Sequence, residues 1–71
     1  MPKRNLDLTI LRKGRTEDRL DLFADPDDVD TLEKTLRNWL VGNKWHAGRW
    51  GEFEMQVRYD GEGKVRRTVR A

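Results

Sequence analysis

The sequence predicts an α+β fold with the element order ββαββ, in which one helix packs on one face of a four-stranded antiparallel sheet. Three observations carry this prediction. Two alternating apolar and polar runs flank Gly14, an amphipathic stretch follows Asp25, and two further alternating runs flank a turn at Asp60–Gly63. A period of two is typical of half-buried strands, and a period near 3.6 is typical of a helix that covers them.

The first two strands are expected at about residues 5–12 and 19–23. In the first run Leu6, Leu8 and Ile10 fall on one face and Leu11 on the other, and in the second run Leu20 and Leu22 share one face. Gly14 lies between the runs and tolerates the positive φ that a tight turn requires. The two runs therefore predict a β-hairpin.

The helix is expected at about residues 26–41. Asp25 is a good N-cap, Pro26 fits the first helical position, and the aspartates that follow oppose the positive end of the helix dipole. Gly42 favours termination. Five apolar residues recur on one helical face, and they are Val29, Leu32, Leu36, Trp39 and Leu40.

The last two strands are expected at about residues 51–59 and 64–70. In the first of them apolar residues occupy every second position from Phe53 to Tyr59. In the second, Arg67 shares the inward face with two valines, which is typical of an edge strand whose charge reaches water. A right-handed crossover from the second strand to the third favours the sheet order 2-1-3-4.

Length and composition limit the class of protein. The 71 residues predict a single domain, residues 1–71, with a thin core, because 35% of them are hydrophobic and 39% are charged. The chain has no cysteine, which excludes disulfides and thiolate-bound metal. No apolar run approaches the roughly 18–20 residues of a membrane span, and no signal peptide follows Met1. We therefore expect a cytoplasmic protein without a membrane partner.

Charge is segregated along the chain in spite of a net charge of only +2. Residues 1–15 carry five basic groups and one acid, residues 16–36 carry eight acids and two basic groups, and residues 37–71 carry eight basic groups and four acids. An acidic middle between two basic ends indicates separate patches for charged partners.

Catalysis and metal binding find little support in the sequence. The absence of cysteine and serine excludes nucleophilic triads built on either residue, and His46 is the one histidine. A calcium loop that starts at Asp25 would need glycine and glutamate where Asp30 and Leu36 stand. We expect no catalytic residue, no metal and no cofactor. A small nuclease or toxin that works through arginine, tyrosine and glutamate stays a distant third hypothesis.

Protein binding is the leading hypothesis. Edge strands can pair with another chain, an acidic surface can meet a basic partner, and exposed tryptophan is a natural interface anchor. A homodimer is a further option, since a thin core benefits from shared buried surface. Whether Trp45 covers the core or binds a partner is left open by its place outside both periodic patterns. The candidate partner-binding residues are Trp45, His46, Arg49, Trp50, Asp27, Asp28 and Asp30.

Nucleic-acid binding is the alternative. A basic turn and a basic last strand can neutralise phosphates, with a tryptophan or Phe23 as a stacking plane. Glu52 and Glu54 on the same sheet face, and the aspartates at the helix start, oppose this hypothesis. The candidate residues are Arg12, Lys13, Arg15, Arg58, Arg66, Arg67 and Arg70.

The C-terminal block GRWGEFEMQVRYDGEGKVRRTVR, from Gly48 to Arg70, and the ten arginines against five lysines give the chain a recognisable type. It resembles the short orphan accessory proteins encoded by bacteriophages of high-GC actinobacteria. This resemblance implies a non-enzymatic protein that interferes with, or adapts to, a host protein or nucleic acid. It carries over no functional residue.

Overall fold

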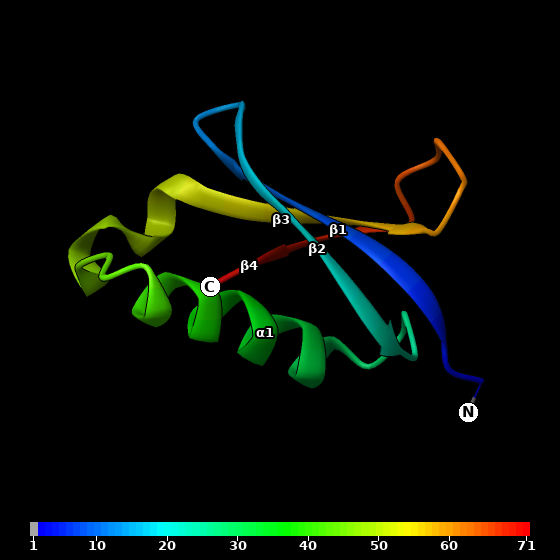
Figure 1. Ribbon diagram of the computed structural model, residues 1–71. Coiled ribbons are helices and arrows are strands. Elements are labelled where there is room, and N and C mark those ends of the chain that lie inside the picture. The colour runs from blue at the N-terminus through cyan, green and yellow to red at the C-terminus, as the bar shows by residue number, and fades with distance from the viewer. Residues whose placement is uncertain (1) are drawn as a thin grey trace.

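The fold is one antiparallel sheet of four strands with one helix on one face, as the computed structural model shows for residues 2–71 (Figure 1). This architecture confirms the predicted fold class, and the sheet order β2-β1-β3-β4 confirms the predicted order. A short 3-10 helix, η1, precedes the third strand. The elements are β1 (Arg4–Arg12), β2 (Arg15–Ala24), α1 (Val29–Gly42), η1 (Ala47–Glu52), β3 (Phe53–Tyr59) and β4 (Arg67–Arg70).

The core lies between the sheet and α1, where the alternating faces of the strands meet the apolar stripe of the helix. Burying a large apolar side chain contributes about 1.5–3 kcal/mol, so these residues supply most of the stability. Trp39, predicted on the same stripe, packs against this core but is only half-buried. The buried apolar residues are Leu6, Leu8, Ile10, Ala24, Leu32, Leu36, Leu40, Phe53, Met55, Val57 and Val69.

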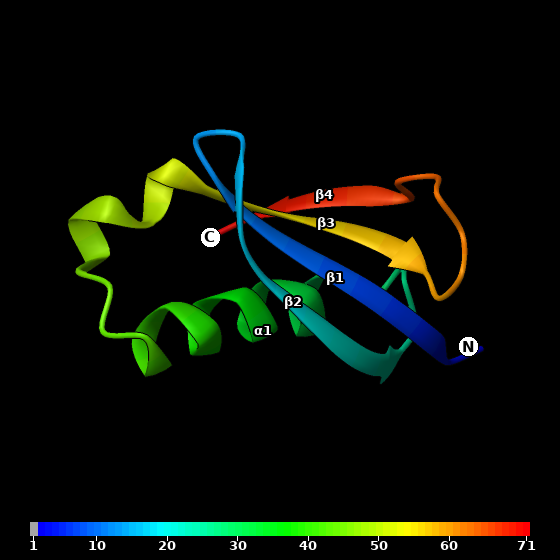
Figure 2. The same ribbon diagram turned by 45° about the horizontal axis from the view of Figure 1, so that its top comes forward.

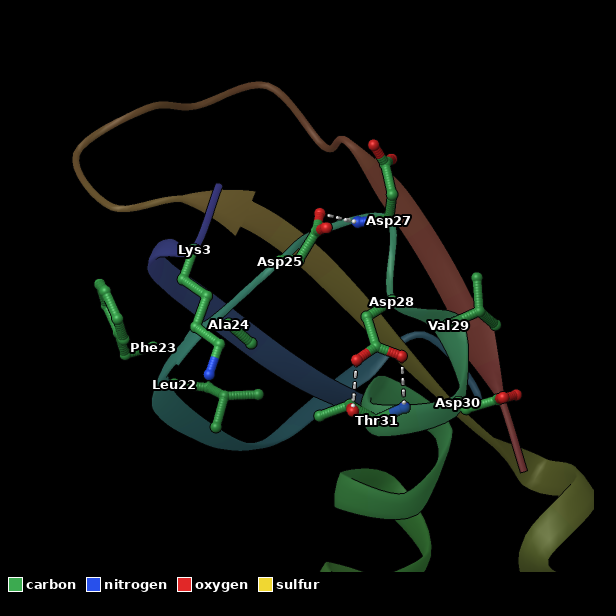
Figure 3. Close-up of a pocket in the computed structure, with 10 residues that line it drawn as sticks. All are labelled: Lys3, Leu22, Phe23, Ala24, Asp25, Asp27, Asp28, Val29, Asp30 and Thr31. Carbon is green, nitrogen blue, oxygen red and sulfur yellow. Dashed lines mark hydrogen bonds between the residues drawn. The ribbon is translucent and has the colours of Figure 1, made fainter. Parts of the chain in front are cut away.

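The helix begins at Val29, three residues later than predicted, because Asp28 and not Asp25 is the N-cap. Asp28 accepts hydrogen bonds from both the backbone N–H and the hydroxyl of Thr31, at 3.2 and 2.7 Å (Figure 3). Asp25 instead accepts the N–H of Asp27 at 2.9 Å and holds a turn before the helix. Two donors from one residue favour the later cap, and the hydroxyl bond is the main reason why the pKa of Asp28 is lowered.

The helix ends at Gly42, and the left-handed residue that follows is Lys44 rather than the glycine. Lys44 donates its N–H to the carbonyl of Val41, and Trp45 donates its N–H to the carbonyl of Leu40. This pair of bonds is a Schellman motif, which turns the chain back toward the core. The motif is what places Trp45 next to the sheet.

Three strand starts differ from the predictions by two residues or more, those of β2, β3 and β4. β2 begins at Arg15 rather than at residue 19, because Lys13 and Gly14, with φ of 51° and 81°, form a two-residue turn that lets pairing start at once. A bulge in β2 leaves Glu17 without a partner in β1. β3 begins at Phe53 rather than at residue 51, because the preceding residues form η1.

β4 is shorter than predicted and starts at Arg67 rather than at residue 64. The loop between β3 and β4 spans residues 60–66, and its left-handed residue is Gly61, at φ 81°, rather than Gly63 at the end of the predicted turn. Arg66 closes this loop by donating its N–H to the carbonyl of Val57 at 2.7 Å. β4 therefore pairs over only four residues.

In the part of the chain that the structure covers, residues 2–71, no helix is both long and apolar enough to cross a membrane.

Candidate functional site

Trp45 closes one end of the core. Its half-buried ring meets the buried ring of Phe53 edge-on, with centroids 4.9 Å apart, and the guanidinium of Arg12 lies 4.7 Å from the Trp45 centroid. Trp39 approaches Phe53 from the helix, with centroids 5.8 Å apart. We call Trp39, Trp45, Phe53 and Arg12 the aromatic cluster. Aromatic and cation–π contacts of this kind each stabilise the fold by about 0.5–1.5 kcal/mol.

Trp50 is half-buried and supports the same end of the core. Its indole N–H donates to the carbonyl of Trp45 at 3.1 Å, which ties η1 to the segment after the helix. The two tryptophans predicted at a partner site therefore both pack against the core, and each is only partly exposed.

Glu52 links the aromatic cluster to η1. Its carboxylate accepts from Nε of Arg12 at 2.9 Å and lies 3.7 Å from Nζ of Lys13 and 3.2 Å from the guanidinium of Arg49. The Arg12 hydrogen bond is the main cause that lowers the pKa of Glu52 below its ordinary value of 4.5. Glu52 thus holds Arg12 in place over the ring of Trp45.

The lowered pKa of Glu52 predicts an acid-sensitive contribution to stability. A carboxyl group whose pKa falls on folding stabilises the native state fully above its unfolded value, and this contribution disappears as the pH drops through the folded value. We expect Glu52→Gln to flatten the loss of stability as the pH falls below about 5, as measured by urea unfolding. NMR titration should show that Arg12→Gln returns the Glu52 pKa toward 4.5. An unchanged Glu52 pKa in Arg12→Gln would contradict this assignment.

His46 and Arg49 are the exposed members of the predicted loop site. Nδ1 of His46 accepts the N–H of Gly48 at 3.1 Å, so the imidazole caps η1. Arg49 pairs with Glu52 at 3.2 Å. The structure brings both residues to one short helix, where each has a local structural contact.

A groove lies at the opposite end of the sheet, where β2 runs into the start of α1 (Figure 3). Its volume is about 570 Å³. Phe23 at its edge is 63% exposed, whereas Asp25 is only 8% exposed. We call this feature the acidic groove. It is lined by Lys3, Leu22, Phe23, Ala24, Asp25, Asp27, Asp28, Val29, Asp30 and Thr31.

The acidic groove contains Asp27, Asp28 and Asp30, which were predicted as partner-binding residues, together with apolar side chains at the end of β2 that were not part of the predicted site. Asp27, Asp28 and Asp30 are exposed, and Arg67 of β4 lies 3.6 Å from Asp27. Phe23 was considered only as a stacking plane for nucleic acid. The alternation of β2 could have indicated an exposed aromatic residue, because Phe23 falls on the polar face of this strand.

The basic residues proposed for nucleic acid fall into two groups: three line one hollow at the turn between β1 and β2, and the others come from β3, β4 and the loop between them. Arg58 lies on the outer sheet face, where it bonds Gln56 and Thr9 at 3.0 and 3.4 Å. Arg66 precedes β4 and stacks on Tyr59, 4.2 Å from the ring centroid. Five of the seven candidates have a carboxylate within 4.0 Å, and they are Arg12, Lys13, Arg66, Arg67 and Arg70.

Among residues 2–71, no group of three or more histidine, aspartate or glutamate side chains is arranged to hold a metal ion. Comparison of the chain with protein-family models, with curated proteins and with solved structures found no match. The fold and its surfaces thus define a small α+β domain with an acidic groove beside an edge strand.

Proposed function

We propose that this protein is a small non-enzymatic module that binds another protein by accepting an extended segment along β2. The observation that carries the proposal is the continuity of the β2 edge with the acidic groove. β2 stands at one end of the sheet order, and no other strand of residues 2–71 pairs with its outer edge. Figure 2 shows β2 on the opposite side of the sheet from β4, with its end close to α1.

Strand addition suits this edge. An added strand gains main-chain hydrogen bonds from the edge, and side-chain contacts next to it supply selectivity. β2 is ten residues long and offers a long template, whereas the other edge strand, β4, has only four residues. Exposed Phe23 gives an apolar anchor, and the carboxylates of Asp27, Asp28 and Asp30 favour a partner segment with lysine or arginine side chains.

A non-enzymatic role is supported by the contacts of the groups that acid–base chemistry would need. His46 caps η1, and Glu52 is held by Arg12. We further propose that the protein acts in the cytoplasm of a bacterial cell, as a phage-encoded accessory protein would.

NMR titration with a defined peptide tests the binding mode. We expect a decapeptide that alternates valine and lysine to shift the backbone amide signals of β2 and of residues 29–31. The same peptide with glutamate in place of lysine should bind at least tenfold more weakly, and added salt should weaken the lysine peptide. At a concentration where the protein is monomeric, amide shifts confined to other elements, or equal affinity for both peptides, would refute the proposed edge.

Matched variants sharpen this test. Asp27→Asn with Asp30→Asn should weaken the lysine peptide severalfold, because both carboxylates line the groove. Asp60→Asn with Glu62→Gln removes the same charge from the loop after β3 and should leave the affinity unchanged. A mixed oligonucleotide pool at low salt tests the nucleic-acid alternative, and retention there without peptide binding would replace our proposal.

A further inference from the structure

We propose that the segment received by the β2 edge is β2 of a second copy of this chain, paired antiparallel about a twofold axis at Leu20. This inference rests on the proposed function, because it requires that β2 is a docking edge. Three features of β2 carry it: its face pattern, its charge order and its uncovered apolar side chains.

The face pattern restricts the register. A twofold axis perpendicular to the sheet keeps both helices on one face, so inward residues must oppose inward residues across the new pair. Four such registers pair most of β2, and they centre on Asp18, Arg19, Leu20 and Asp21. In three of them a charged central residue opposes its own copy, which is destabilising. The Leu20 register alone avoids this repulsion.

In the Leu20 register opposite charges meet twice. Arg19 of each copy lies opposite Asp21 of the other, and both side chains are exposed in the single chain. Directly opposed charges of opposite sign stabilise an antiparallel pair. The bulge at Glu17 limits the regular ladder, but both charged pairs fall inside it. The strand is therefore complementary to itself in this one register.

The charge order along β2 extends this complementarity beyond the strand. β2 starts at the basic turn, where Lys13 and Arg15 are exposed, and it ends at the acidic groove. Antiparallel pairing places the basic turn of each copy beside the acidic groove of the other. The attraction acts at both ends of the interface and is weakened by salt. In this arrangement the segregation of charge along the sequence gives each copy a basic end and an acidic end that attract the opposite ends of the other copy.

Apolar surface supports the same occupant. Leu20 and Leu22 face inward but are only half-buried, since they lie at the margin of the sheet. The twofold axis sets Leu20 against its own copy, whereas Leu22 lies opposite Asp18 of the other copy. For a chain of 71 residues, this shared surface enlarges a thin core.

Sedimentation velocity over a concentration series tests the dimer. We expect the wild-type protein to dimerise as its concentration rises. Arg19→Asp and Asp21→Arg should each weaken the dimer about tenfold or more, because each turns two attractive contacts into two repulsive ones. The double variant R19D/D21R should restore dimerisation, because it reverses both pairs. Arg37→Asp on the exposed side of α1 is the control and should dimerise like the wild type.

Mixing the two single variants gives a stricter result. Arg19→Asp offers two acids and Asp21→Arg offers two arginines at the same positions, so the mixture should form a heterodimer while each variant alone stays largely monomeric. Circular dichroism verifies that every variant is folded. A wild-type protein that stays monomeric at 500 µM, or a dimer that Arg19→Asp leaves intact, would overturn the inference.

These outcomes separate the inference from the proposed function. A monomeric wild type that still binds the lysine peptide at β2 removes the second copy as the partner and retains the docking edge. A monomer that binds no peptide at β2 removes both.

Discussion

Replacing Phe53 with alanine is expected to remove most of the free energy of unfolding of the protein at room temperature. Phe53 is fully buried at the start of β3, where it contacts Trp39 and Trp45 and lies below Arg12. Truncation of a buried phenylalanine costs about 3–5 kcal/mol. A domain of this size lies near the lower end of the usual 5–15 kcal/mol of stability, so the loss removes most of it.

Urea unfolding followed by circular dichroism measures this effect. Phe53→Leu is the matched control, because it keeps an apolar side chain of similar volume and should cost less than about 1.5 kcal/mol. Phe53→Ala that unfolds cooperatively with a loss below about 1 kcal/mol would show that the aromatic cluster does not hold this end of the core.

The fold could be predicted from local sequence patterns because the residues that form its core recur with the local period of a strand or a helix. The buried residues alternate along each strand and form a stripe along the helix. The preference for a right-handed crossover then favours one sheet order. Boundaries were harder to predict where two residues of the same kind compete. Asp25 and Asp28 are both good caps, and the choice depends on the hydroxyl of Thr31.

The start of β4 was predicted too early, because the contact that sets it is not local. The valine and arginine alternation continues through Val65, yet β4 starts only at Arg67. The bond from Arg66 to the carbonyl of Val57 sets where pairing resumes after the loop. That contact joins distant residues and leaves no mark in the local pattern.

In the candidate site, too, the residues that are clustered in the sequence could be predicted, and the contacts between distant segments could not. The aspartates of the acidic groove are close together in the sequence and could be predicted as a cluster. The groove is also lined by Leu22 and Phe23 from the end of β2, which were not predicted with them. Trp45 lies outside any period, and its neighbours come from β1 and β3. Arg12 was assigned to the basic surface although it continues the inward phase of β1. The alternation of β1 could therefore have predicted that Arg12 lies on the inward face.

Replacing Trp45 with alanine is expected to lower the free energy of unfolding by about 2–4 kcal/mol, less than a fully buried aromatic residue because its ring is half-exposed. The loss has two components. Phe53 loses its edge-on neighbour, and the guanidinium of Arg12 loses the ring below it while Glu52 still holds it in place. Trp45→Phe retains an aromatic face toward both and should recover more than half of the stability.

Urea unfolding of Trp45→Ala, read beside lysine-peptide binding, decides between the two roles that the sequence left open for this residue. If Trp45 covers the core, Trp45→Phe should bind the peptide with wild-type affinity, because Trp45 follows the C-terminal end of α1 whereas the acidic groove lies at the start of α1. Val41→Ala, at a helix position 61% exposed, is the control and should change stability by less than about 0.5 kcal/mol. A Trp45→Ala protein of wild-type stability that no longer binds the peptide would assign the ring to the partner surface instead.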